Sequence, residues 1–174
     1  KGNQIPLEDQ IIKVADEYDA IVSKRQYKTH IKISETLKIL IKESQPSTKE
    51  VALDNAANGA KVGRLNKKVV KTLFKVVIED TEYEISCLMG YIKFLKDEIK
   101  RLETIQDYEN KMYNSKTEKK KKYYEEGMKL LFSEGENFDN YPNVLSEYKE
   151  ALENRNGIIN SLFDEIKIIK KLKV

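Results

Sequence analysis

Hydrophobic residues recur at alternating steps of three and four in two stretches of the chain. The first stripe consists of Ile85, Leu88, Ile92, Leu95, Ile99 and Leu102. The second consists of Leu145, Tyr148, Leu152, Arg155, Ile159, Leu162, Ile166 and Ile169, with one polar member. This spacing keeps one face of a helix toward a partner, so it predicts two long helices that pack side by side.

The second stripe is too wide for the seam of a two-stranded coiled coil. Arg155 interrupts it, and further apolar residues flank it at Ile158, Phe163, Ile168 and Leu172. A wide apolar face is typical of a helix in a globular bundle. We therefore interpret the two stripes as the buried faces of helices that form the core of a globular bundle.

The start of the chain has the signals of another helix. Pro6 precedes Glu8 and Asp9, and proline and acidic residues are both favoured in a first turn. Apolar positions then continue to about residue 43, with a bend or a break over 24–30 left open. Pro46 predicts the end of this region, because the residue before a proline is pushed out of the helical conformation.

The remaining helices are predicted from capping signals and loops. Two capping boxes, at 47–50 and 115–118, predict a short helix ending near 58–59 and a helix extending to Phe132. Between the two capping boxes, a helical pattern covers 65–77 and is followed by the first stripe. The helix that carries the first stripe should continue to about Tyr113. The pattern is compatible with a turn near 79–81 and also with one continuous helix through this point. A loop at 133–143 precedes the last helix, which we expect to be the longest.

These elements predict an all-α fold, a bundle of five or six helices with a long C-terminal helix. The length of 174 residues suits a single helical domain over 1–174. Because the sequence begins with Lys1 and not with methionine, we expect it to be a fragment of a longer protein. No apolar run is long enough to predict a membrane span.

The composition does not favour nucleic-acid binding. The net charge is only +3, and 29 acidic residues are interleaved with 32 basic ones. Nucleic-acid binders usually gather positive charge on one face. Only four of the basic residues are arginines, and lysine is the poorer bidentate reader of phosphate.

Residues for catalysis or metal binding are scarce. His30 is the only histidine and Cys87 the only cysteine, too few for a zinc site. Cys87 lies within the first stripe, so we expect it to be packed or partly covered. The acidic stretches 16–19 and 134–139 lack the spacing of a calcium-binding EF-hand loop. We therefore predict no catalytic residue, no cofactor and no metal site, and a non-enzymatic protein.

Tyrosines at predicted helix ends and loops are the best candidates for a contact surface. Burial should be incomplete at Tyr27, Tyr113, Tyr123, Tyr124 and Tyr141. Exposed tyrosine is favoured at protein interfaces, although ordinary packing at helix corners is the alternative. A run of lysines adjoins some of these tyrosines; by itself it is typical of a solvated helix face. The predicted partner-binding residues are Tyr113, Lys119, Lys120, Lys121, Lys122, Tyr123 and Tyr124.

The segments 110–126 (NKMYNSKTEKKKKYYEE) and 154–174 (NRNGIINSLFDEIKIIKKLKV) are rich in Lys, Asn, Ile and Tyr. In this composition the chain resembles the mature surface lipoproteins of Lyme-disease spirochetes. Its length and helical layout look most like the C-terminal domain of the OspEF-leader-peptide (Elp) lipoproteins. The resemblance rests on composition and layout, and it identifies no binding residue.

The resemblance implies a location and a partner. It implies a protein held on the bacterial outer membrane by an N-terminal lipid anchor. It also implies binding of the host complement proteases C1r/C1s and inhibition of the classical pathway. Two alternatives stay open: an adhesin for decorin or glycosaminoglycan that uses the lysine patches, and an intracellular coiled-coil scaffold protein.

Overall fold

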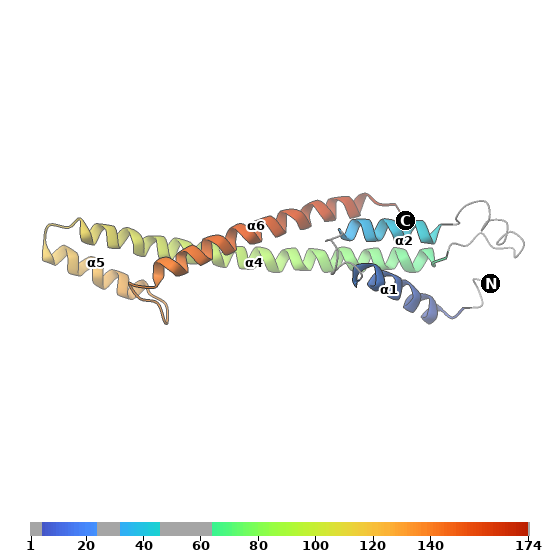
Figure 1. Cartoon of the computed structure of the whole chain (residues 1–174), viewed down its shortest axis with the longest axis horizontal. Coiled ribbons are helices and arrows are strands. Elements are labelled where there is room, and N and C mark those ends of the chain that lie inside the picture. The colour runs from blue at the N-terminus through green and yellow to red at the C-terminus, as the bar shows by residue number, and fades with distance from the viewer. Residues whose placement is uncertain (1–4, 24–31, 46–63, 174) are drawn as a thin grey trace, which may run out of the picture. The chain divides into compact units, whose positions relative to one another are not determined.

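The computed structural model describes residues 5–23, 32–45 and 64–173. In these ranges the chain forms five helices and no strand (Figure 1). The helices are α1 (Leu7–Ser23), α2 (Ile33–Ser44), α4 (Lys67–Tyr113), α5 (Glu118–Leu131) and α6 (Tyr141–Lys171). The prediction of an all-α bundle with a long C-terminal helix is confirmed. The short helix predicted from the capping box at 47–50 lies outside the described residues.

The longest helix is α4, with 47 residues against 31 in α6, so the prediction that the last helix is longest was wrong. Of the two possibilities left open at 79–81, the structure has one continuous helix. Thr81 is buried at this point, and its hydroxyl donates a hydrogen bond of 2.7 Å to the carbonyl oxygen of Val77. This bond to the preceding turn satisfies the hydroxyl without a break in the helix.

The contacts within the chain divide it into two compact units. The first consists of Lys1–Glu84 and Ser161–Val174, and the second of Ile85–Asn160. Both α4 and α6 therefore contribute to both units. The single domain over 1–174 remains a prediction.

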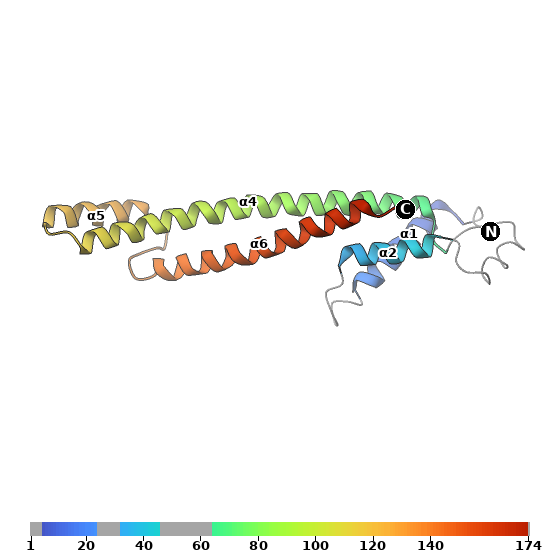
Figure 2. The same cartoon turned by 90° about the horizontal axis from the view of Figure 1, so that it is seen from above.

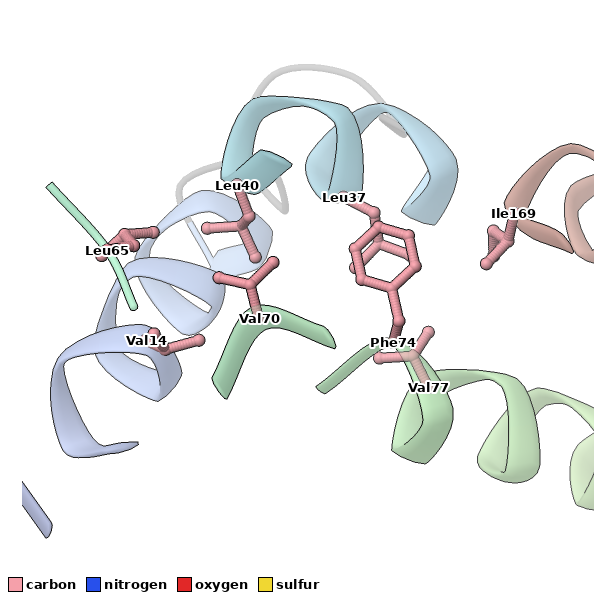
Figure 3. Close-up of a cluster of buried hydrophobic side chains, with 8 residues drawn as sticks. All are labelled: Val14, Leu37, Leu40, Leu65, Val70, Phe74, Val77 and Ile169. Atoms are coloured by element: carbon pink, nitrogen blue, oxygen red, sulfur yellow. The ribbon is translucent and has the colours of Figure 1, made fainter. Parts of the chain in front are cut away.

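The first unit has a core built from α1, α2, the start of α4 and the end of α6. Its buried side chains point toward one another in Figure 3. They are Val14, Leu37, Leu40, Leu65, Val70, Phe74, Val77 and Ile169. Because fully burying one such side chain contributes about 1.5–3 kcal/mol, this cluster is what holds the two short helices against the long ones.

The second unit has a core of its own, to which α4, α5 and α6 contribute. Its buried residues are Ile99, Leu102, Ile105, Met128, Tyr141 and Leu145. In this unit α6 runs alongside α4 (Figures 1 and 2), and Lys149 on α6 pairs with Glu103 on α4 at 2.7 Å. The inward orientation predicted for both stripes is confirmed, because every member is buried or half-buried.

Three residues that the sequence placed at the packed face are more exposed than predicted. Ile158 and Phe163 are 39% and 38% exposed, and Cys87 is exposed as well. Neighbours on a helix differ by about 100° in direction. Because Ile159 and Leu162 point into the packed face, the adjacent Ile158 and Phe163 turn toward its edge. Cys87 is likewise displaced by its position beside Leu88.

The predicted helix ends are partly confirmed. The end before Pro46 is correct, since α2 ends at Ser44. The capping box at 115–118 is wrong: α5 begins at Glu118 after Thr117, which makes no side-chain capping bond. The hydroxyl of Ser115 instead donates a hydrogen bond of 2.6 Å to the carbonyl oxygen of Lys111, in the last turn of α4, so its side chain is engaged with α4 and does not cap α5.

The N-terminus of α2 is capped by a side chain from α6. Oε2 of Glu165 accepts a hydrogen bond of 2.9 Å from the backbone N–H of Ser34, while Lys32 at the N-cap position provides no side-chain cap. The Glu165 side chain is only 7% exposed, and Nζ of Lys32 lies 3.9 Å from Oε1. A carboxylate is favourable there, because the first N–H groups of a helix lack partners within it.

We predict that Glu165→Ala destabilises the first unit by about 1–3 kcal/mol, because a buried N–H loses its acceptor. Amide hydrogen exchange should accelerate at Ser34 in particular, and urea unfolding should give the loss of stability. Glu165→Gln is the matched control, since its amide oxygen can still accept the bond. Unchanged protection of Ser34 in the alanine variant would show that α6 does not cap α2.

Candidate functional site

The predicted contact residues lie where α4 ends and α5 begins. Residues 114–117 connect the two helices, and α5 folds back beside the end of α4 (Figure 1). We call this surface the α4–α5 corner. Its residues are Tyr113, Lys119, Lys120, Lys121, Lys122, Tyr123 and Tyr124.

Close packing holds α5 against α4 behind the corner. The rings of Tyr124 and Tyr108 meet edge to face with centroids 5.6 Å apart, and Met128 is fully buried. Gly127 lies against the same tyrosine: a Cβ there would come within 2.9 Å of Cε2 of Tyr108. The absence of a side chain at Gly127 thus permits this approach of the two helices.

A charged network fixes the other end of α5. Arg101 on α4 donates two hydrogen bonds of 2.7 Å to the carboxylate of Glu136 and one of 2.8 Å to the carbonyl oxygen of Leu131, the last residue of α5. Arg101 also pairs with Glu98 at 2.7 Å. The hydrogen bonds with Glu136 raise the pKa of Arg101 and lower the pKa of Glu136. Such forked pairs fix orientation as well as distance, so α5 is held at both ends.

Two of the predicted tyrosines are largely exposed. Tyr113 at the end of α4 is 72% exposed and Tyr123 on α5 is 66% exposed. Tyr124 is half-buried and supports Tyr123, with the two ring centroids 5.4 Å apart. The corner therefore presents two accessible aromatic rings on helices that packing holds in place.

Tyr141 departs from its prediction. It was expected to be incompletely buried, but it is only 1% exposed and belongs to the core of the second unit. Its hydroxyl donates a hydrogen bond to Glu109 on α4. Burial, and then the bond with Glu109, raise the pKa of Tyr141. Tyr27 lies outside the described residues.

A cavity of about 530 Å³ opens at the corner. It is lined by Met112, Tyr113, Glu118, Lys121, Lys122 and Glu125. Three of the seven predicted residues thus meet in one hollow, with a half-buried methionine among them. Its charges are paired locally: Lys121 lies 2.9 Å from Glu118, and Glu125 lies 2.6 Å from Lys129, which lowers the pKa of Glu125.

Lys119 and Lys120 are exposed but do not line the cavity. Among the described residues neither has a carboxylate partner, so both ammonium groups are available to an acidic surface. Lys119 and Lys120 therefore add positive charge to the surface near Tyr123.

Leu130 is an exposed apolar residue that was not among the predicted contact residues. It is 87% exposed, and it lies seven residues after Tyr123 on α5, so the two share one side of the helix. The adjacent pair Leu130 and Leu131 was the available signal, since consecutive helical residues cannot both face the core.

Other functional chemistry is sparse in the part of the chain that the structure describes. Within the described ranges, no group of three or more His, Cys, Asp or Glu side chains is placed to hold a metal ion. None of the described helices is long and apolar enough to cross a membrane. His30 lies outside these ranges.

Comparisons with known proteins give one local similarity. A family model described as HD domain matches residues 1–47, the part of the chain that contains α1 and α2. The match covers 47 of the 174 residues and does not include the α4–α5 corner. No curated protein and no solved structure matches the chain.

The pairing of Glu136 with Arg101 predicts a pH dependence of stability. Because the folded-state pKa of Glu136 is lowered, the pair stabilises the fold above the unfolded pKa of about 4.3. That contribution is lost as the pH falls through the lowered pKa. We expect Glu136→Gln to cost about 1–3 kcal/mol at neutral pH and to make unfolding less sensitive to acid below about pH 5.

Urea unfolding measured across this pH range tests the prediction. Glu134→Gln, an exposed substitution in the same loop, is the matched control. Parallel stability profiles of wild type and Glu136→Gln would contradict it.

Proposed function

We propose that this chain is a non-enzymatic protein-binding domain that contacts a host serum protein through the α4–α5 corner. The observation that carries the proposal is the exposure of Tyr113 and Tyr123, at 72% and 66%, on two helices anchored to each other. Tyrosines that are already held in place lose little freedom on binding and are frequent among residues that dominate interface energies. Lys119 and Lys120 pair with no carboxylate of the residues that the structure describes, which favours a partner with an acidic surface.

The sharper form of the proposal comes from the resemblance to the Elp lipoproteins. The partner is then the complement proteases C1r/C1s, and the chain inhibits the classical pathway from the bacterial outer surface as a means of immune evasion. A lipid anchor attached to the N-terminal side would hold it there. The helical frame supports this, because it presents the lysine- and tyrosine-rich segment 110–126 at a corner.

We predict that replacing Tyr113 and Tyr123 together with alanine weakens capture of the serum partner by at least about 2 kcal/mol, or roughly 30-fold in Kd. Wild-type chain on beads would be incubated with serum, and the retained proteins identified and titrated. Tyr83→Ala is the matched control, because Tyr83 is 71% exposed but lies in the first unit. Equal loss in the control, or no loss in the double variant, would remove the corner from the interface.

The identity of the captured partner tests the sharper form. Recovery of C1r/C1s supports complement inhibition. Retention on heparin that disappears with added salt, without recovery of these proteases, supports the glycosaminoglycan adhesin, because contacts between exposed charges are screened. Capture of no serum protein, together with no retention on heparin, overturns the host-protein proposal and leaves the intracellular scaffold as the favoured alternative.

A second candidate is favoured by the family match. We propose as this alternative that residues 1–47 are part of an HD domain and that the α4–α5 corner belongs to a helical module joined to it. The match lies over α1 and α2, whereas the corner lies in the second unit. Under this candidate the α4–α5 corner is one part of a larger protein that also contains the HD domain.

The sequence that encodes the full-length protein distinguishes the two candidates. The first predicts a signal peptide that ends at a cysteine, the site of lipid attachment. The second predicts that the match to the HD domain extends directly upstream of Lys1. Mass spectrometry of the protein isolated from its cell would show which N-terminus is present, and each result excludes the other candidate.

A further inference from the structure

An apolar groove runs between α1 and the first turns of α4 in the first unit. Its volume is about 450 Å³. Its lining residues are Leu7, Ile11, Val14, Ala15, Lys68, Val69, Thr72, Leu73 and Val76. Only a lysine and a threonine among them are polar, so an occupant would meet an almost entirely hydrocarbon surface.

The apolar walls of this groove remain open to solvent. Leu7 is 58% exposed, Ile11 49% and Val76 54%. The core of the unit takes up Val14 from α1 and Val70, Phe74 and Val77 from α4. The apolar face of each helix is therefore wider than its own core needs. Contiguous exposed apolar surface of this kind is characteristic of an interaction site.

The two walls of the groove carry opposite charge. Helix α1 has five carboxylates, Glu8, Asp9, Asp16, Glu17 and Asp19, against one lysine, Lys13. The first turns of α4 carry Lys67, Lys68, Lys71 and Lys75 and no acidic residue before Glu79. At about 100° per residue, Glu8 falls beside Ala15 on the rim of one wall, and Lys68 and Lys75 fall on the rim of the other.

This charge pattern is self-complementary. A two-fold axis parallel to the groove places α1 of each copy over the basic start of α4 of the other copy. The two copies then make the same set of contacts, because each contact from the first copy to the second is matched by one from the second to the first. The perpendicular two-fold would place acidic α1 on acidic α1, which electrostatic repulsion opposes. The apolar residues then meet at the centre, with the charges at the rim.

We propose that two copies of this chain associate through this groove, with α1 of each copy packed against α4 of the other. We infer a second copy as the occupant because the acidic α1 wall of one copy complements the basic α4 wall of the other. The interface lies in the first unit, whereas the α4–α5 corner belongs to the second. This inference is independent of the proposed function.

Sedimentation equilibrium of the full chain over a range of concentrations tests the proposal. The wild type is expected to form dimers, and Ile11→Asp to abolish them, because it places a charge at the centre of the interface. Ile11 is half exposed in the single chain, so the variant should still fold, which circular dichroism would verify. A wild type that stays monomeric at every concentration overturns the proposal.

A charge exchange tests the orientation of the two copies. Glu8→Lys and Lys68→Glu should each weaken dimerisation roughly tenfold, and their combination in one chain should restore it. Asp9→Lys is the matched control, since it lies in the same first turn of α1 but about 100° away from Glu8. Weakening by Asp9→Lys equal to that by Glu8→Lys, or failure of the combined variant to recover, overturns the proposed arrangement.

Discussion

Burial of one apolar stripe along α4 is the constraint on which the rest of the structure depends. The stripe supplies Val70, Phe74 and Val77 to the core of the first unit, and Ile99, Leu102 and Ile105 to the core of the second. A helix of 47 residues gains most of its stability from packing along such a stripe. The other four described helices are placed by what they bury against it.

The stripe occupies only one side of α4, so side chains on the outer side do not contribute to the two cores. The corner depends on this separation: Met128 and Tyr124 face inward and fix α5, and that packing orients Tyr123 and the lysines outward. The forked pair between Arg101 and Glu136 adds a polar fastening that apolar packing alone does not provide, since it also engages the last carbonyl of α5.

The two candidate surfaces differ in the physics of recognition. The α4–α5 corner combines exposed aromatic rings with the exposed lysines Lys119 and Lys120, which suits a polar and acidic partner. The groove of the first unit is hydrocarbon at its centre and charged at its rim, which suits a helix face with the same pattern. Since the surfaces belong to different units, a change at one need not alter the other.

Local periodicity determined much of this protein from its sequence alone. The steps of three and four identified the inward faces of α4 and α6, Pro46 marked the end of α2, and proximity along the chain grouped Tyr113 with the lysines and Tyr123. Three of those residues do line one cavity. These features follow from spacing over one or two helical turns, which a sequence displays directly.

Tertiary structure decided what no local spacing contains. Tyr141 and Tyr123 were both predicted to be incompletely buried, yet Tyr141 is buried against Glu109 in the core of the second unit and Tyr123 is exposed. Thr81 sits within a continuous helix, and Glu165 caps a helix 131 positions away. The physical reason is the same in each case: the energy of a polar or aromatic side chain depends on which distant groups share its desolvated surroundings, and folding alone brings those groups together.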